Sequence, residues 1–132
     1  MASSQPPGAL QIEIPATADR LIYVRRRLSA WLRPFGLHES TAHDIVLAVD
    51  EACTNSIEHA YSGDSGTIRI DAEPANNQIK VKVADSGMWR EPAEKRYRGR
   101  GLRIMEALSE RLDLFTSDSG TTVQMIFGLT AH

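Results

Sequence analysis

Two pairs of neighbouring segments with alternating apolar and polar residues limit the folds that this chain can adopt. Residues 67–72 and 78–83 alternate on either side of an Asn-Asn dipeptide, a pattern that predicts an antiparallel hairpin. A second such pair, near 112–116 and 122–127, flanks Gly120. Because strands that follow one another directly form antiparallel pairs, this pattern excludes the alternating strand and helix order of a doubly wound parallel sheet.

Helical periodicity fills most of the remaining sequence. The remaining predicted elements are, in order, a strand over 10–14 that Pro15 ends, a helix capped by Thr17 or Asp19 and closed by Pro34 and Gly36, a helix over 39–61, and a helix over 99–110. Residues 85–98 show no clean period. This order predicts the α+β class, as a two-layer sandwich in which helices cover one face of a mixed, mostly antiparallel sheet.

The length and composition predict one domain. With 132 residues, of which 42% are hydrophobic and 24% charged, the chain has an ordinary globular composition. We expect a flexible N-terminal segment over 1–9 and a folded domain over 10–130. No apolar run approaches the roughly 18 residues that span a bilayer, and the first residues lack the features of a signal peptide. We therefore expect no membrane association and, by elimination, a cytoplasmic location.

Charge and cysteine content narrow the function classes. The formal net charge is −2, so the chain as a whole has no electrostatic attraction for nucleic acid. The one local basic cluster, Arg25–Arg27, falls in a helical pattern and is interpreted as a solvated helix face. Cys53 is the single cysteine, which excludes an intrachain disulfide. Its apolar neighbours on the helix predict a buried, unreactive thiol.

Two polar patterns point to chemistry at the ends of predicted elements. The second predicted helix holds Glu51 and Asn55 four residues apart and hence on one face. A carboxamide oxygen there can ligate Mg²⁺, and a carboxylate can accept a proton. Asp85 follows a buried strand and can accept a hydrogen bond from an exocyclic amine, while Gly87 lets the backbone approach a flat ring. Taken singly, each pattern is also common on ordinary helix faces and in turns.

Glycines and arginines precede the third predicted helix. Gly99 and Gly101 stand at its start, where unpaired N–H groups and the helix dipole favour phosphate. Arg98 and Arg100 can add charge-assisted contacts. The plain alternative is a flexible connector into an amphipathic helix. In the turn predicted at 120–122, a hydroxyl can support the carboxylate at the end of the first hairpin.

In this order and on these element types, the four patterns resemble the signature boxes of the GHKL superfamily of ATPases and kinases. More narrowly, three segments are similar to those of the anti-sigma-factor serine kinases of bacterial stress and sporulation switches. These segments are 51–61 (EACTNSIEHAY), 99–105 (GRGLRIM) and 120–123 (GTTV). The resemblance covers about residues 10–128 and implies the Bergerat type of ATP-binding fold.

The resemblance implies a role for each matched residue. Asn55 would hold the Mg²⁺ that bridges the phosphates of ATP, and Glu51 would be the catalytic residue that activates the hydroxyl of a protein serine. Asp85 would bind the amino group of adenine, with Thr122 nearby. Gly87 would let the base lie close to the backbone.

The phosphates would lie on the segment that opens the third helix. By the same resemblance, Gly99, Gly101 and Leu102 would form the nucleotide-binding segment, with Arg98 or Arg100 as a charge partner. Phosphoryl transfer needs mainly positioning and charge neutralisation, which such a segment supplies.

The resemblance also implies protein partners. One is a STAS-type anti-sigma-factor antagonist that the kinase phosphorylates on serine, and the other is a sigma factor that the same protein sequesters. Members of this family commonly form homodimers.

Trp89 departs from the family's pattern, because the first glycine box commonly ends in glycine at that position. The segment between the hairpin and the third helix is also short, only 88–98. A second function therefore stays open, namely a GHKL-fold module that binds nucleotide weakly and regulates transcription by protein contact alone. A histidine-kinase catalytic domain is a third alternative, which the lack of long dimerisation helices disfavours.

Overall fold

The computed structural model describes residues 8–59, 66–85, 100–117 and 120–129. The strands are β1 (Leu10–Pro15), β2 (Thr67–Ala75), β3 (Gln78–Asp85), β4 (Arg111–Ser117) and β5 (Gly120–Gly128). The described helices are α1 (Leu21–Leu32), α2 (Glu39–His59) and α4 (Arg100–Leu108), with short 3-10 turns η1 (Ala18–Arg20) and η2 (Arg33–Phe35).

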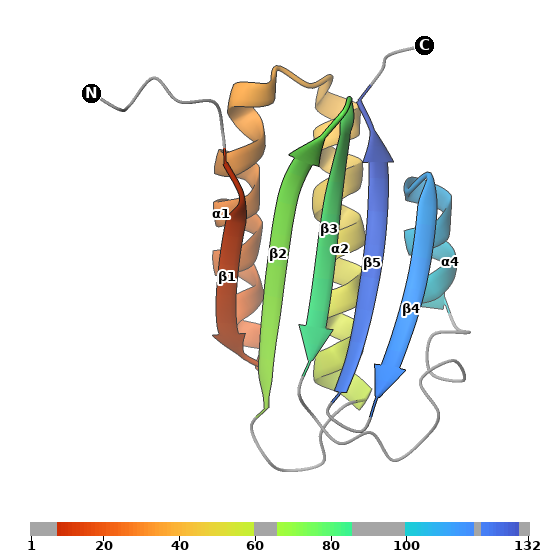
Figure 1. Ribbon diagram of the computed structural model, residues 1–132. Coiled ribbons are helices and arrows are strands. Elements are labelled where there is room, and N and C mark those ends of the chain that lie inside the picture. Colours follow the sequence, from red (N-terminus) through yellow and green to blue (C-terminus); the bar gives the residue numbers. More distant parts are fainter. Residues whose placement is uncertain (1–7, 60–65, 86–99, 118–119, 130–132) are drawn as a thin grey trace.

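The five strands form one sheet in the order β1-β2-β3-β5-β4. All four ladders of the described sheet are antiparallel. Figure 1 shows α1, α2 and α4 side by side on one face of this sheet. The predicted two-layer α+β sandwich is confirmed, although the described sheet is wholly antiparallel rather than mixed.

The core lies between the two layers. Alternation along β1, β2, β3 and β5 turns every second side chain toward the helices, and apolar stripes on the helices meet these side chains. The buried residues include Ile12 and Ile14 of β1, Ile68 and Ile70 of β2, Val81 and Val83 of β3, Val123 and Met125 of β5, Val24 and Leu28 of α1, Ile45 and Val49 of α2, and Met105 of α4. The predicted patterns therefore bury the faces that their periods indicated.

The boundaries of two elements differ from those predicted. Strand β2 continues through Pro74 to Ala75, whereas the alternation predicted its end at residue 72. The ladder with β1 stops at Ala72, so Pro74 pairs only with β3 and its missing N–H disturbs no second ladder. Helix α4 ends at Leu108 rather than at residue 110, because the N–H of residue 110 already donates to the carbonyl of residue 126 across the sheet, at 2.7 Å.

The start of the first helix also differs from the prediction. Thr17 occupies the N-cap of the short turn η1 and makes no side-chain capping bond. Asp19 lies inside η1, so α1 begins only at Leu21. Gly36 ends η2 in the left-handed conformation, with φ of 65°, as its predicted closing role requires.

The arginine cluster lies on the exposed side of α1. Arg25 pairs with Asp50 of α2 at 2.9 Å, and Arg27 donates a hydrogen bond of 2.7 Å to the hydroxyl of Tyr23. Two of the three arginines thus make contacts within the chain, which agrees with a solvated helix face. In the part of the chain that the structure describes, no helix is both long and apolar enough to cross a membrane.

Cys53 should react far more slowly with thiol reagents in the native protein than in the unfolded chain. Its side chain is fully buried, and burial, with a smaller contribution from Asp50, raises the pKa of the thiol from 9.0 to about 12. At pH 8 the native thiolate fraction is then about a thousandfold lower than the unfolded one. Labelling with a chromogenic disulfide reagent, with and without urea, measures both rates, and equal rates would contradict the buried position.

The same difference predicts how the stability depends on alkaline pH. Between pH 9.0 and about 12 the unfolded chain releases the thiol proton of Cys53 while the native chain keeps it. The contribution of this group to stability is therefore complete below pH 9.0 and is lost as the pH rises toward 12.

Candidate functional site

One end of the two layers collects the polar patterns that the sequence singled out. Figure 1 shows the C-terminal end of α2, the end of β3 and the start of β5 at the same end of the molecule, and the first turn of α4 faces that end. The antiparallel register explains part of this arrangement, because Asp85 at the end of β3 lies opposite Thr121 at the start of β5. Segments far apart in the sequence therefore contribute to one region.

The C-terminal half of α2 carries a carboxylate beside a carboxamide. Glu51 and Asn55 are one helical turn apart, so their side chains are neighbours. Glu51 is half-buried, and Asn55 is buried with 8% of its surface exposed. The orientation of α2 about its own axis follows from its apolar stripe, in which Ala52 and Cys53 are fully buried against the core.

The first turn of α4 approaches this pair at a glycine. A Cβ added to Gly101 would lie 3.5 Å from Oε1 of Glu51 and 3.7 Å from Nδ2 of Asn55. No side chain therefore separates the backbone of this turn from the two polar groups. Because the first N–H groups of a helix lack intrahelical partners and carry the positive end of the dipole, this turn favours an anion.

A buried hydrogen bond connects α2 to the end of β3. The hydroxyl of Ser56 donates to Oδ2 of Asp85 over 3.0 Å, and the two residues are 1% and 5% exposed. The alternation of β3 turns Asp85 toward the helices, in line with the buried Val83. The sequence patterns did not single out Ser56, because the residues near a lone serine in a helix do not show which distant residue its hydroxyl contacts.

The strand register distinguishes the two threonines of the Gly-Thr-Thr segment. Thr121 lies directly opposite Asp85 and is 4% exposed, so its side chain shares the helix-facing side of the sheet. Thr122 pairs with Ala84 and is half-buried on the opposite face. The residue expected near Asp85 was Thr122, and the structure places Thr121 there instead, because these residues form the start of β5 and not a tight turn.

The remaining predicted residues divide between described and undescribed parts of the chain. Gly87, Trp89, Arg98 and Gly99 lie outside the described residues. The first residue of α4 is Arg100, of whose side chain nothing is described. The next residue but one, Leu102, packs partly buried against the core. The structure thus brings Glu51, Asn55 and Gly101 together and shows Asp85 held from the same helix.

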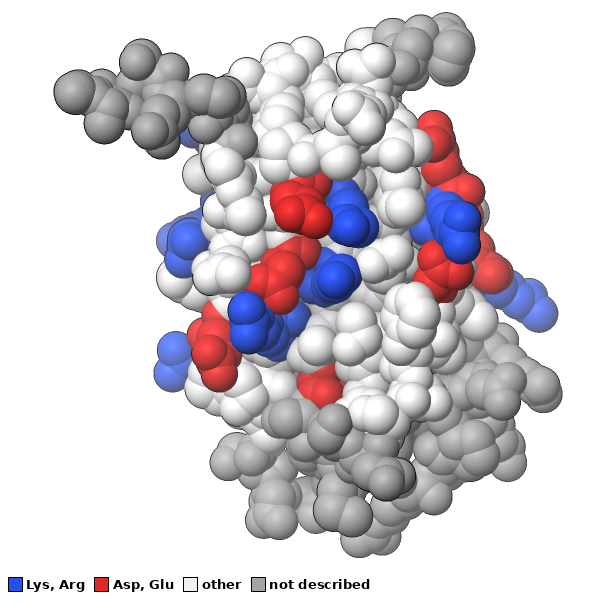
Figure 2. All heavy atoms as spheres, in the orientation of Figure 1, with Lys and Arg blue, Asp and Glu red and all other residues white. Residues whose placement is uncertain are grey.

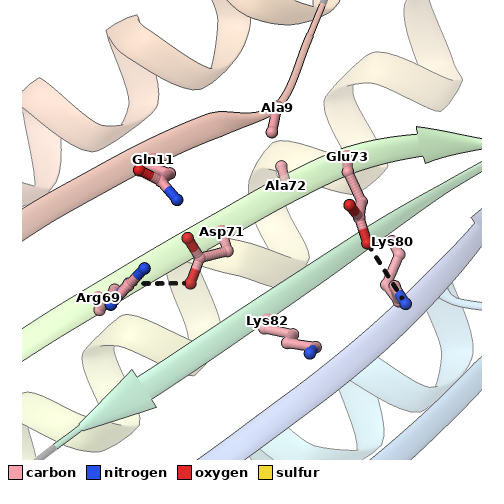
Figure 3. A pocket seen from close by; sticks show the side chains of 8 residues that line it. All are labelled: Ala9, Gln11, Arg69, Asp71, Ala72, Glu73, Lys80 and Lys82. Carbon is pink, nitrogen blue, oxygen red and sulfur yellow. Dashed lines mark ion pairs between the residues drawn. The ribbon is translucent and has the colours of Figure 1, made fainter.

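Two hollows lie away from this site. One, of about 270 Å³, opens on the outer face of the sheet and is lined by Ala9, Gln11, Arg69, Asp71, Ala72, Glu73, Lys80 and Lys82. Figure 3 shows the ion pairs within it, Arg69 with Asp71 at 3.1 Å and Lys80 with Glu73 at 3.4 Å. Figure 2 shows acidic and basic side chains interleaved over this face. Such exposed pairs contribute little energy, and the mixed charge favours no ligand of one sign.

The second hollow, of about 390 Å³, lies between the C-terminal end of α1 and the start of α2. It is lined by Ser29, Leu32, Arg33, Leu37, Glu39, Ala42, His43 and Val46. Neither of these two hollows includes a described residue of the candidate site.

Comparison with known proteins identifies the sequence relatives of this chain. The serine-protein kinase RsbW of Bacillus thuringiensis (strain Al Hakam) is 32% identical over 79 residues, which are 60% of this chain and 49% of that protein. The serine-protein kinase RsbW of Bacillus mycoides (strain KBAB4) is 30% identical over the same length. The matched region thus spans about half the length of these curated relatives.

Solved structures share the arrangement of helices and strands. The structure of the RsbU and RsbW domains of Rv1364c from Mycobacterium tuberculosis matches 94% of this chain with a TM-score of 0.78 and 31% identity, over 33% of its own length. The histidine kinase AdeS of Acinetobacter baumannii matches 68% of this chain with a TM-score of 0.53 and 14% identity, over 48% of its own length, and this likeness shows the fold alone.

The family model for the histidine kinase-like ATPase domain matches residues 14–127, nearly the whole of the described sheet and helices. The matched range contains α2, β3, α4 and most of β5, the elements that form the candidate site. The resemblance inferred from the sequence patterns is confirmed by this match and by the relatives named RsbW. The chain belongs to the histidine kinase-like ATPase domain family.

Proposed function

We propose that this chain is an ATP-dependent serine protein kinase domain that phosphorylates a STAS-type anti-sigma-factor antagonist and sequesters a sigma factor. One observation carries the proposal: the carboxylate of Glu51 and the carboxamide of Asn55 meet the first turn of α4 at Gly101. This arrangement offers a proton acceptor, a neutral ligand and an anion-favouring backbone within one region. The similarity to serine-protein kinases named RsbW supports the choice of a protein serine as acceptor.

The donor set fits one Mg²⁺ that is shared with phosphates. Among the residues that the structure describes, no three His, Cys, Asp or Glu side chains gather to hold a metal. The ion would be held by the amide oxygen of Asn55 together with phosphate oxygens of ATP, a common arrangement for magnesium. When bound, Mg²⁺ neutralises charge on the phosphates.

The residues around the phosphates have separate tasks in this proposal. Glu51 accepts the proton of the attacking serine hydroxyl, and the first N–H groups of α4 bind phosphate oxygens. Gly101 keeps that turn close to the pair because it carries no side chain. Gly99, with Arg98 or Arg100, extends the phosphate contacts on the segment before and at the start of α4, and Leu102 supports that segment through its packing.

The adenine end of the site rests on the end of β3. Asp85 accepts a hydrogen bond from the amino group of adenine, and Gly87 allows the base to lie against the backbone. Thr121 supplies the neighbouring hydroxyl in place of Thr122, because it shares the face of Asp85. The buried position of Asp85 strengthens such a hydrogen bond, since little water competes for the carboxylate.

The proposed partners follow from the similarity to RsbW kinases. A STAS-type antagonist presents the acceptor serine, and a sigma factor is the second partner. A homodimer and a cytoplasmic location belong to the same proposal.

Replacing Asn55 by alanine should weaken ATP binding in a magnesium-dependent way. We expect the Kd for ATP in the presence of Mg²⁺ to rise at least about tenfold, because the metal loses the protein ligand that this proposal assigns to it. In the presence of a chelator, the wild type and Asn55→Ala should bind ATP nearly equally. Calorimetric titration of ATP and ADP, with and without Mg²⁺, measures both effects.

Gln124→Ala is the matched control, since it removes a carboxamide from the opposite face of the sheet. Its affinity for ATP should stay within about twofold of the wild type. Absence of ATP binding by the wild type at millimolar concentration would sink the kinase proposal. The better account would then be the binding module that regulates by protein contact, the alternative that Trp89 favours.

A further inference from the structure

The hydrogen bond between Ser56 and Asp85 has no role in the proposed function as it stands. The Ser56 hydroxyl donates to Oδ2 of Asp85 over 3.0 Å, with both residues almost fully buried. This bond joins α2 to the end of β3, at the carboxylate that the proposed function assigns to adenine. A group that touches such a carboxylate from behind can control how it meets a ligand.

Ser56 and Asp85 are the polar ends of two apolar rows. By helical spacing, position 56 lies on the buried face of α2. By the alternation of β3, position 85 lies on the buried face of that strand. The apolar members are Ile45, Val49 and Ala52 in α2 and Ile79, Val81 and Val83 in β3. An alanine at position 56 would continue the first row, but it would remove a hydrogen-bond donor from the buried carboxylate of Asp85. The serine is therefore matched to the carboxylate and not to the core.

The bond constrains the carboxylate in two ways. A buried carboxylate needs hydrogen-bond donors to offset its lost hydration, and the Ser56 hydroxyl is such a donor. Because the hydroxyl contacts one oxygen, Oδ2, it also restricts rotation of the carboxylate group of Asp85. A carboxylate offers about four acceptor positions, and the contact with Ser56 uses one of them.

We propose that Ser56 is a positioning residue for base selection: it orients the Asp85 carboxylate so that this group accepts a hydrogen bond from the exocyclic amine of a purine. The inference rests on the proposed function, in which Asp85 binds adenine. Ser56 itself does not touch the base and acts through Asp85. Its removal should thus affect a base that carries the amine and spare one that lacks it.

The test compares ATP with purine riboside triphosphate, which has hydrogen in place of the 6-amino group. Calorimetric titration gives the Kd of both nucleotides for the wild type, Ser56→Ala and Ser56→Thr. We expect the wild type to prefer ATP about tenfold or more, which is the scale of one well-oriented hydrogen bond to a charged group. Ser56→Ala should lose most of this preference through weaker ATP binding, with the analogue's Kd changed less than about twofold. Ser56→Thr keeps a hydroxyl and should keep the preference.

Thr54→Ala is the matched control, because it removes a hydroxyl two residues earlier on the same helix. It should leave the preference for ATP unchanged. Ser56→Cys provides a second variant with a weak donor and nearly the same volume, should Ser56→Ala fail to fold; we expect an intermediate preference. Thermal unfolding of each variant separates loss of stability from loss of selectivity.

Three results would overturn the inference, and they can be distinguished from one another. If the wild type binds ATP, but the Ser56 variants weaken ATP and the analogue equally, Ser56 serves only the structure, and the proposed function stands. If the wild type binds neither nucleotide at millimolar concentration, the nucleotide site itself is wrong, and both proposals fall. Retention of the full preference in Ser56→Ala would equally contradict the positioning role.

Discussion

Glu51→Gln should abolish most of the phosphotransfer while leaving ATP binding nearly intact. The substitution keeps the size of the side chain and its position beside Gly101. In the wild type, Oε1 of Glu51 is 3.5 Å from the place where a Cβ at Gly101 would lie. It removes the group that accepts the proton of the serine hydroxyl. General base catalysis of this kind contributes about 10²- to 10⁴-fold, so we expect the rate constant to fall by that factor. The Kd for ATP should change by less than about threefold, since Glu51 is not the metal ligand in this proposal.

The measurement is single-turnover transfer of labelled γ-phosphate to a STAS-domain protein that the wild type phosphorylates. Glu39→Gln is the matched control, because it makes the same chemical change at the opposite, exposed end of the same helix. That variant should transfer phosphate at the rate of the wild type. A Glu51→Gln variant that keeps the wild-type rate would remove Glu51 from the chemistry and leave positioning alone to explain catalysis.

The class of the fold could be predicted because apolar residues recur in the sequence with the two-residue period of strands or with the period of helices. Alternation over 78–83 and the helical stripe over 39–61 each specify one buried face, and the structure buries those faces. Element ends were predicted less well, because they depend on neighbours. The extension of β2 past Ala72 depends on its continued pairing with β3, which no local pattern contains.

The same difference applies to the candidate site: local spacing predicts some of its residues, and others depend on contacts with distant segments. Glu51 and Asn55 could be paired from the sequence, because helical spacing alone fixes their common face. The choice between Thr121 and Thr122 required the register between β3 and β5, and a shift by one residue reverses the face of a strand. Ser56 escaped notice because its significance depends on a bond across 29 positions of the sequence.

The polar residues of the site share a physical feature that sequence analysis can use. Asn55, Ser56, Asp85 and Thr121 are the four buried polar residues of the described chain, and they lie in the C-terminal part of α2 and where the end of β3 pairs with the start of β5. Burial of polar groups costs free energy, so a cluster at one end of an otherwise apolar core needs a compensating role. A ligand with complementary donors and acceptors supplies that role.

Gly101→Ala should make the protein slightly more stable and a much weaker binder of ATP. No positive φ requires glycine at this position, and a methyl group would make ordinary contacts of 3.5 Å with Glu51 and 3.7 Å with Asn55. Alanine in a helix restricts the unfolded chain, so we expect a gain of about 0.5 kcal/mol in the free energy of unfolding. The same methyl would occupy the space through which phosphate reaches the N–H groups of α4, and the Kd for ATP should rise at least about tenfold.

Gly36→Ala makes the same chemical change with the opposite expected result. Gly36 has φ of 65° and no atom within 4 Å of an added Cβ, so strain in the left-handed region is the main effect. It should lose about 1 kcal/mol of stability and keep the wild-type affinity for ATP. Urea unfolding gives the free energy of unfolding of both variants, and calorimetric titration gives their Kd for ATP. If Gly101→Ala kept the wild-type affinity for ATP, the first turn of α4 would be excluded as the phosphate site. A phosphate bound beside Glu51 and Asn55 would collide with the added methyl group.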